Sequence, residues 1–229
     1  MFYAPNLLTD NVLPEEESQH AAKVLRLRIG DEIEIVDGKG SLCKARITNP
    51  HPKHCEFEII SRHFVEKKNY LLHIAIAPTK NIDRLEWFIE KATEIGIDSI
   101  TPIVCRFSER KIIKPERLEK IIISASKQSL RAYFPVLNPI CSFDDFIKSS
   151  KENQIFIAHC YEEDKQTLKQ LCQLNTDTLI LIGPEGDFSQ DEVQNALSKG
   201  FRPISLGASR LRTETAGIVA CHTVTFTNE

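Results

Sequence analysis

Two glycine-containing segments near the C-terminus carry the residues whose types and spacing could bind and act on a ligand. One reads GPEGDFSQDE from Gly183, and the other reads LGASRLRTETAG from Leu206. The stretch 183–217 contains five of the nine glycines of the chain. Glycine is used where the backbone takes a positive φ angle or where a ligand approaches the main chain closely. The spacing therefore indicates either several sharp turns or the walls of a ligand site.

The familiar phosphate-binding patterns do not occur in the chain. It has neither G-x-G-x-x-G nor G-x-x-x-x-G-K-[ST], and no serine or cysteine stands in a nucleophile-elbow sequence. Spacing alone leaves two interpretations open, glycines that only permit tight turns and glycines that admit a ligand. It does not choose the ligand.

The residues around the two segments predict the elements that hold them. TLILIG (178–183) is a buried-strand pattern, and GPEGDF is the turn at its carboxyl end. Ser189 and Glu192 have capping-box spacing, which predicts a helix at about 190–199. A short strand, PISL, leads into the second segment, and a last helix is expected from Thr213. Because open α/β sheets bind ligands beyond the carboxyl ends of their strands, the two loops could form two walls of one crevice.

Two hydrophobicity patterns meet near residue 65. Before it, a helical pattern at 14–27 and alternating residues around an Asp37-Gly38 turn predict a small β-rich domain, such as a barrel. From residue 71 onward, strands alternate with helices, which predicts an α/β domain with a mostly parallel sheet and helices on both faces. Strands are expected at 71–77, 99–105, 154–160, 178–183 and 203–206, and helices at 83–95, 116–130, 142–150, 165–174, 190–199 and from 213.

Composition is typical of a soluble globular protein: 229 residues, 41% hydrophobic and a net charge of −3. No apolar run approaches the roughly 20 residues that span a bilayer, and the N-terminus lacks signal-peptide features, so we expect a cytoplasmic protein with no membrane partner. The seven cysteines include no C-x-x-C pair and are expected to be buried free thiols. HPKHC (51–55) has no second group of ligands after it, so no metal is expected.

A local excess of positive charge occurs at 106–131, where eight basic residues stand against three acidic ones. Such a patch could bind phosphates although the whole chain is slightly acidic. A solvated helical face is the alternative, and composition alone favours it somewhat.

The glycine segments also carry a resemblance. LIGPEGDFSQDEV and LGASRLRTETAGIVA, preceded by VLRLRIGDEIEIVDGKG and KNIDRLEWFIEKATEIGIDSITPIVCRFSER, closely resemble the bacterial 16S rRNA (uracil-N3)-methyltransferase family over nearly the whole chain. The resemblance implies a PUA-like RNA-binding β-barrel at 1–65 and a SPOUT-type methyltransferase domain at 71–229, with a trefoil knot that holds S-adenosylmethionine. It also implies a homodimer, no metal, and 16S rRNA or the small ribosomal subunit as partner.

The resemblance assigns expected roles to individual residues. Arg212 is expected to stabilise the uracil anion that forms when N3 loses its proton, and Glu214 could accept that proton or serve as a structural partner for an arginine. Arg212 could instead form only a surface ion pair. The cofactor is expected to contact Gly183, Pro184, Glu185, Gly186, Leu206, Gly207, Ser209, Leu211 and Thr215. RNA is expected to contact Arg26 and Arg28 in the small domain, and Lys80, Arg84, Arg110, Lys111, Lys127 and Arg131 in the large one.

The chain departs from the family pattern at a few positions. Asp187 stands where the family usually has glycine, Ser209 where it has arginine, and Lys127 where it has glutamate. Asp187 is expected just outside the cofactor turn, whereas Ser209 and Lys127 bear on substrate contacts. Two other functions remain open: methylation of another RNA position, such as a ribose 2′-hydroxyl, and a noncatalytic role in ribosome assembly.

Overall fold

The computed structural model describes residues 1–162 and 164–229, which form two compact units. The first comprises Met1–Lys67 and Ile123–Phe134, and the second comprises Lys68–Ile122 and Pro135–Glu229. A single division of the sequence near residue 65 does not describe this arrangement, because residues 123–134 belong to the first unit. The helix α3 (Pro115–Gln128) begins in the second unit and ends in the first.

The first unit is built on a four-stranded sheet in the order β1-β2-β3-β4. Its strands are β1 (Phe2–Tyr3), β2 (Glu32–Val36), β3 (Ser41–Asn49) and β4 (Glu56–Phe64). β1 is one edge strand and pairs with β2, while Val12 bridges Glu56 on the other edge strand, β4. The first thirteen residues therefore reach both edges of the sheet. Apolar side chains that include Leu7, Ile35 and Phe57 form the core of this unit.

The helical pattern at 14–27 forms a shorter structure than the sequence predicts. The helix α1 covers Glu15–Gln19 and continues as a π-helical segment, η1, over His20–Val24. Arg26 then takes a positive φ of 54°, the left-handed conformation that commonly ends a helix. The expected turn at Asp37 is confirmed, because its Oδ1 accepts hydrogen bonds from the backbone N–H groups of Lys39 and Ser41.

The second unit contains a seven-stranded sheet, and the prediction of a mostly parallel sheet is confirmed. The strand order is β11-β9-β10-β5-β6-β7, with β8 also paired to β6, and every pair is parallel. The strands are β5 (Leu72–Ile76), β6 (Ser99–Val104), β7 (Val136–Leu137), β8 (Cys141–Ser142), β9 (Gln154–Ala158), β10 (Thr178–Ile182) and β11 (Arg202–Ile204).

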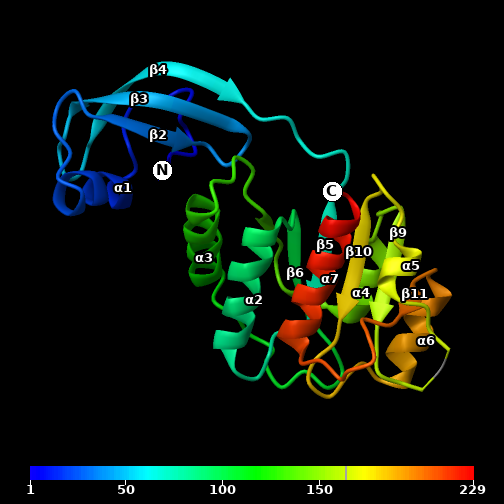
Figure 1. The fold of residues 1–229 in the computed structure, drawn as a ribbon. Helices are drawn as coiled ribbons and strands as arrows, with labels where there is room; N and C mark the ends of the chain where they lie inside the picture. The colour runs from blue at the N-terminus through cyan, green and yellow to red at the C-terminus, as the bar shows by residue number, and fades with distance from the viewer. Residues whose placement is uncertain (163) are drawn as a thin grey trace. The chain divides into compact units, whose positions relative to one another are not determined.

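Helices cover both faces of this sheet. On one face α2 (Ile82–Ile95) and α7 (Thr213–Thr227) lie side by side, and α7 also contacts β5 and β10 (Figure 1). A Cβ at Gly217 would lie 2.6 Å from the Phe88 ring, so the glycine lets the two helices approach closely. The other face packs against α4 (Phe143–Ser149) and α6 (Gln190–Ser198). A short helix, α5 (Leu168–Leu171), also contacts α7.

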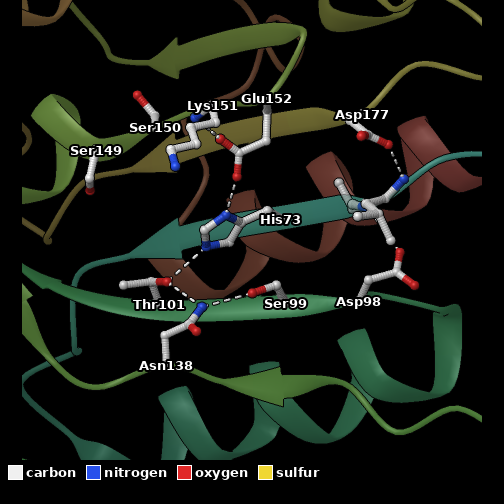
Figure 2. Close-up of polar contacts among 12 residues, drawn as sticks. His73, Asp98, Ser99, Thr101, Asn138, Ser149, Ser150, Lys151, Glu152 and Asp177 are labelled. Atoms are coloured by element: carbon white, nitrogen blue, oxygen red, sulfur yellow. Dashed lines mark hydrogen bonds and ion pairs between the residues drawn. The ribbon is translucent and has the colours of Figure 1, made fainter. Parts of the chain in front are cut away.

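A polar network ties several strands of this unit together. Figure 2 shows the ring of His73 on β5 between two partners, with Nδ1 2.6 Å from Glu152 Oε1 and Nε2 2.7 Å from Thr101 Oγ1. The amide nitrogen of Asn138 donates to Thr101 Oγ1 and to Ser99 Oγ, both at 2.8 Å. The network thereby joins β5, β6 and the segments next to β7 and β9.

No helix in the described part of the chain has the length and apolar character needed to cross a membrane.

Candidate active site

A large hollow of the second unit lies beyond the carboxyl ends of β9, β10 and β11, where the sequence predicts a ligand site. It has a volume of 590 Å³ and lies between the segment after β9, the turn after β10 and the loop after β11. A neighbouring cavity of 300 Å³ reaches Gly183, Pro184 and Glu185. The two share the lining residues Ala158, Cys160, Asp187, Arg210, Leu211 and Ala216. They therefore form one composite hollow, called the crevice below.

Short hydrogen bonds hold the walls of the crevice together. The hydroxyl of Thr213, at the start of α7, donates to the main-chain carbonyl of Gly183 at 3.0 Å. Asp187 Oδ2 accepts from the backbone N–H of Cys160 at 2.7 Å, so the turn after β10 is joined to the segment after β9. Ser189 and Glu192 form the expected capping box, which fixes the start of α6 directly after this turn.

The position of Asp187 differs from the one expected from the sequence. It lines both parts of the crevice instead of lying just outside the cofactor turn. Its φ is 67°, a left-handed conformation that glycine adopts freely and aspartate tolerates better than most residues. Its carboxylate also accepts from its neighbour, since the N–H of Phe188 lies 2.8 Å from Oδ1. Both hydrogen bonds help aspartate to replace a glycine here.

The glycines serve different purposes in the two walls. Gly207 has a φ of 126°, and a Cβ built on it would meet no atom within 4 Å. Gly183 has no positive φ, but a Cβ there would lie 3.1 Å from the ring of Phe188. Gly207 therefore supplies an unusual backbone conformation beside open space, whereas Gly183 permits close packing.

The crevice has both apolar and polar lining residues. Ile204, Leu206, Leu211 and Ala216 contribute aliphatic surface. A flat, uncharged ring fits such a lining, because backbone N–H and C=O groups can bind its polar edge while aliphatic groups cover its faces. Exposed Arg210 also lines the crevice and can attract an anionic group.

Residues 158–161 and Lys165 form a third wall that the sequence analysis did not identify. The ammonium group of Lys165 donates to the carbonyls of His159 and Tyr161 at 2.8 and 2.6 Å, and the Tyr161 hydroxyl donates to Phe188 O. The segment contains no glycine, so the signal used for the other two walls is absent. It is a wall because β9 lies next to β10 in the folded sheet, and no spacing in the sequence indicates that order.

The cysteines also differ from expectation. Cys43, Cys55, Cys105 and Cys221 are buried, but Cys160 is exposed and lines the crevice. Partial desolvation, and then the charge of Asp187, raises the pKa of the Cys160 thiol. The thiol is therefore protonated near neutral pH, which makes it a poor nucleophile. No group of three metal-binding side chains occurs among residues 1–162 and 164–229.

A third cavity, of 480 Å³, lies at the N-terminal ends of α2 and α7. It is lined by Asp83, Arg84, Trp87, Arg212, Glu214 and Thr215. Arg212 also lines the smaller part of the crevice, so this exposed side chain stands between the two spaces. Thr215, which the sequence places at the cofactor, lines this third cavity. The Nε atom of Arg84 is 3.8 Å from Glu214 Oε1.

The basic residues expected to contact RNA are placed in both units. Arg26 and Arg28 are exposed in the first unit. Lys127 and Arg131 lie in the stretch Ile123–Phe134, which packs with the first unit. Lys127 forms a 2.6 Å ion pair with the buried Glu17, which competes with a phosphate contact.

In the second unit, three of these basic residues gather around a 440 Å³ cavity. Lys80, Arg110 and Lys111 line it, and Lys80 pairs with Glu109 at 2.9 Å. The guanidinium of Arg110 donates to the carbonyls of Thr79 and Lys80, so it supports the backbone around this cavity.

Comparisons with known proteins agree with this geometry. The family model described as an RNA methyltransferase domain matches residues 66–225, and an RNA methyltransferase PUA domain matches residues 13–60. The ribosomal RNA small subunit methyltransferase E of Rickettsia conorii is 30% identical over 224 residues, which cover 95% of this chain and 91% of that protein.

Two solved structures resemble the whole chain. A Porphyromonas gingivalis protein described as a "probable rRNA-methyltransferase" has a TM-score of 0.92 and 43% identity, with 98% of each chain covered. A ribosomal RNA small subunit methyltransferase E from Neisseria gonorrhoeae, bound to S-adenosyl methionine, has a TM-score of 0.82 and 28% identity, with 96% of this chain and 94% of that chain covered.

Proposed function

The chain belongs to the RNA methyltransferase family, and from this membership we propose that it transfers a methyl group from S-adenosylmethionine to N3 of a uridine in 16S rRNA of the small ribosomal subunit. One structural observation carries the proposal at the level of residues. Arg212 lines both the crevice beyond the strand ends and the cavity between α2 and α7. A side chain so placed can act on an acceptor base next to a bound methyl donor.

The crevice fits S-adenosylmethionine in shape and chemistry. Gly207 leaves open space beside its backbone, and the aliphatic lining suits an adenine ring. The proposed cofactor contacts are those expected from the sequence, except for Thr215, which lines the third cavity and is assigned to the acceptor base. Asp187, Cys160 and Arg210 are added because they line the crevice. S-adenosylmethionine, when bound, supplies an electrophilic methyl group on a sulfonium.

The protein must prepare N3 of uridine for attack. N3 carries a hydrogen, and its lone pair becomes a good nucleophile only when that proton leaves. The resulting negative charge spreads over N3, O2 and O4. We assign its stabilisation to the guanidinium of Arg212 and to the N-terminus of α7, whose backbone N–H groups and dipole favour an anion. Glu214 is the proposed acceptor of the N3 proton.

RNA binding is assigned first to Arg26 and Arg28. They follow the π-helical segment η1, and the neighbouring apolar residues Val24, Leu25 and Ile29 are also exposed. Charged and apolar groups on one exposed segment suit a nucleic-acid strand, because phosphates contact the arginines while bases contact the apolar groups. Lys80 and Lys111 are proposed to extend the RNA contact on the second unit, whereas Lys127 serves mainly as the partner of Glu17.

A homodimer is the proposed assembly. The helix α7 is apolar on most sides, yet its residue Phe226 is 62% exposed. A helix of this kind is normally buried all round, so a second copy of the chain is the proposed cover. Phe226→Glu should convert a dimer into a monomer in analytical ultracentrifugation. A monomeric wild-type protein at micromolar concentration would contradict this assembly.

The knot and the cellular location complete the proposal. After β11 at the edge of the sheet, the chain returns to its centre and starts α7 against the turn after β10, as a trefoil knot would require. A crystal structure whose chain path does not thread this turn would exclude the knot.

The cytoplasm is the proposed location, and recovery of the protein only from the membrane fraction of lysed cells would contradict it.

Mass-spectrometric mapping of 16S rRNA tests the reaction. Cells that carry the gene should contain a 3-methyluridine that is absent when the gene is deleted and restored by complementation. A lost 2′-O-methyl nucleotide would instead support the second function considered above. Unchanged rRNA together with no binding of S-adenosylhomocysteine in calorimetry would support a noncatalytic assembly factor.

A further inference from the structure

A buried carboxylate in the cavity between α2 and α7 has an unsatisfied oxygen. Glu214 is 7% exposed, and its Oε2 has no hydrogen-bond partner among the described residues. Its other oxygen lies 3.8 Å from Arg84 Nε, which is too long for a good hydrogen bond. A buried polar atom without a partner is costly, so a donor supplied by a ligand would be stabilised here.

Two arginines line the same cavity as this carboxylate. Arg84 approaches it from α2, and Arg212 lines the same cavity from the residue before α7. No side chain caps the N-terminus of α7, so its first-turn N–H groups also keep their capacity to donate. The cavity thus offers hydrogen-bond donors together with one unsatisfied acceptor.

An aromatic ring completes the cavity. Trp87 is the single tryptophan of the chain, and it is 43% exposed. Its neighbours Leu85 and Phe88 point into the core and are fully buried. Trp87 stands three residues after Arg84, so both lie on the same side of α2. An exposed indole beside a polar cavity is a suitable platform for a stacked base.

We propose that Trp87, Arg84, Glu214 and Arg212 form the acceptor-base pocket and select uracil over cytosine. The inference rests on the proposed function and assigns a substrate to the cavity. The edge of uracil presents an acceptor, a donor and an acceptor, at O2, N3–H and O4. A carboxylate that shares its cavity with two guanidinium groups can offer the complementary pattern, one acceptor and several donors. Cytosine presents a lone pair at N3 and an amino group at C4, which would face the carboxylate and a guanidinium with the wrong polarity.

The same arrangement accounts for each proton and electron pair of the transfer. The N3 proton moves to Glu214, and the N3 lone pair forms a bond to the methyl carbon as the carbon–sulfur bond breaks. The sulfur keeps the electron pair of that bond and becomes a neutral thioether. Glu214 returns its proton to solvent after the product leaves. Trp87 acts as a positioning residue, because it orients the ring without contacting the reacting atoms.

Fluorescence of the protein reports directly on the pocket. Since Trp87 is the sole tryptophan, stacking of a base should quench the indole emission. We expect quenching when uridine 5′-monophosphate is added to the protein saturated with S-adenosylhomocysteine, and at least tenfold weaker binding of cytidine 5′-monophosphate. Equal quenching by the two nucleotides would overturn the claim of selectivity, and no quenching by either would overturn the pocket.

Single-turnover methylation of small subunits from gene-deleted cells tests the two key residues. Glutamine is nearly isosteric with glutamate, and Glu214→Gln should lower the rate by about a hundredfold or more. Its affinity for S-adenosylhomocysteine should be unchanged. Its rate should rise more steeply with pH than the wild-type rate does. Trp87→Ala should raise the half-saturating concentration of subunits by about tenfold, whereas Trp87→Phe should restore most of it. Glu116→Gln, at an exposed acidic residue in the first turn of α3, is the matched control.

The outcomes separate this inference from the proposed function. If wild-type protein makes 3-methyluridine but Glu214→Gln and Trp87→Ala behave like Glu116→Gln, the pocket is wrong and the function stands. If wild-type protein methylates no uridine and binds no S-adenosylhomocysteine, the proposed function itself fails. A Glu214→Gln variant that loses thermal stability and cofactor affinity together would make Glu214 a structural partner of Arg84 and would overturn its role as proton acceptor.

Discussion

The hydroxyl of Thr213 donates a 3.0 Å hydrogen bond to the main-chain carbonyl of Gly183, and this bond joins the first residue of α7 to the turn after β10. Both residues are buried, and both line the smaller part of the crevice. The bond therefore fixes the distance between the proposed cofactor turn and the helix that starts next to Arg212.

Thr213→Val tests the importance of this connection. Valine has nearly the same shape but leaves the Gly183 carbonyl without its donor, which should cost about 1–3 kcal/mol of folding free energy. We expect a lower thermal midpoint and weaker binding of S-adenosylhomocysteine in calorimetry. Thr223→Val, which removes a hydroxyl bonded to Val219 within the same helix, is the control and should keep wild-type affinity. Equal affinities for both variants would show that the connection does not shape the site.

Gly207→Ala tests whether the open space beside this residue is where the cofactor binds. Alanine is strained at a φ of 126°, and its Cβ would project into space that is free of protein atoms. Gly200→Ala is a matched control, because Gly200 also has a positive φ, 89°, with no atom within 4 Å of a Cβ. Both variants should lose stability, but only Gly207→Ala should bind S-adenosylhomocysteine at least tenfold more weakly. A similar affinity in the two variants would remove Gly207 from the site.

Replacement of Arg26 and Arg28 by alanine tests the RNA surface of the first unit. Each lost phosphate contact should reduce the slope of log affinity against log salt by about one. The variant should bind small-subunit rRNA more weakly and S-adenosylhomocysteine normally. Lys44→Ala with Arg46→Ala removes the same charge from exposed residues of β3 and should change the slope less. An unchanged slope for the Arg26 and Arg28 variant would make both arginines ordinary surface residues.

Acid stability should depend on Glu152. Burial alone would raise its pKa, but hydrogen bonds from His73 and the backbone outweigh burial and hold the pKa of Glu152 below 4.5. A carboxyl whose folded pKa is lowered stabilises the protein above its unfolded pKa and loses that contribution as the pH falls. Glu152→Gln should therefore lower the thermal midpoint at pH 7, and the difference from wild type should shrink below pH 4.5.

The exposed Asp145 provides the comparison for Glu152. Its pKa is also lowered, chiefly by a hydrogen bond from Ser142, but solvent screens the charge, so Asp145→Asn should change the thermal midpoint little. A constant difference between Glu152→Gln and wild type from pH 7 to pH 3.5 would contradict this account of the network.

Local sequence patterns predicted most elements of the fold, because their causes are local. The helix expected at 83–95 forms α2 and ends at Gly96, which has a positive φ of 126°, and Ser189 and Glu192 cap α6 as their spacing indicates. The loops predicted after the strands β10 and β11 also form two walls of the crevice, as expected. These features depend on residues within a few positions of one another.

The remaining features depend on contacts between distant parts of the chain. Lys127 pairs with Glu17 across 110 residues, and Glu214 meets Arg84 only because α7 packs beside α2. Residues 158–161 and Lys165 form a wall because β9 lies between β10 and β11 in the sheet. No periodicity or spacing in the sequence reports such packing, so these contacts could be found only in the folded structure.

The rate of methyl transfer by an Arg212→Lys variant tests the central claim most directly. Lysine keeps the charge but loses the planar guanidinium that can reach two atoms of the uracil anion. Single-turnover formation of 3-methyluridine on small subunits from gene-deleted cells should slow by about tenfold to a thousandfold, with little change in the affinity for cofactor or subunits. Raising the pH should partly restore the rate, because more uridine is then ionised. If the variant instead loses subunit affinity in proportion to rate, Arg212 binds a phosphate in the ground state and does not stabilise the anion.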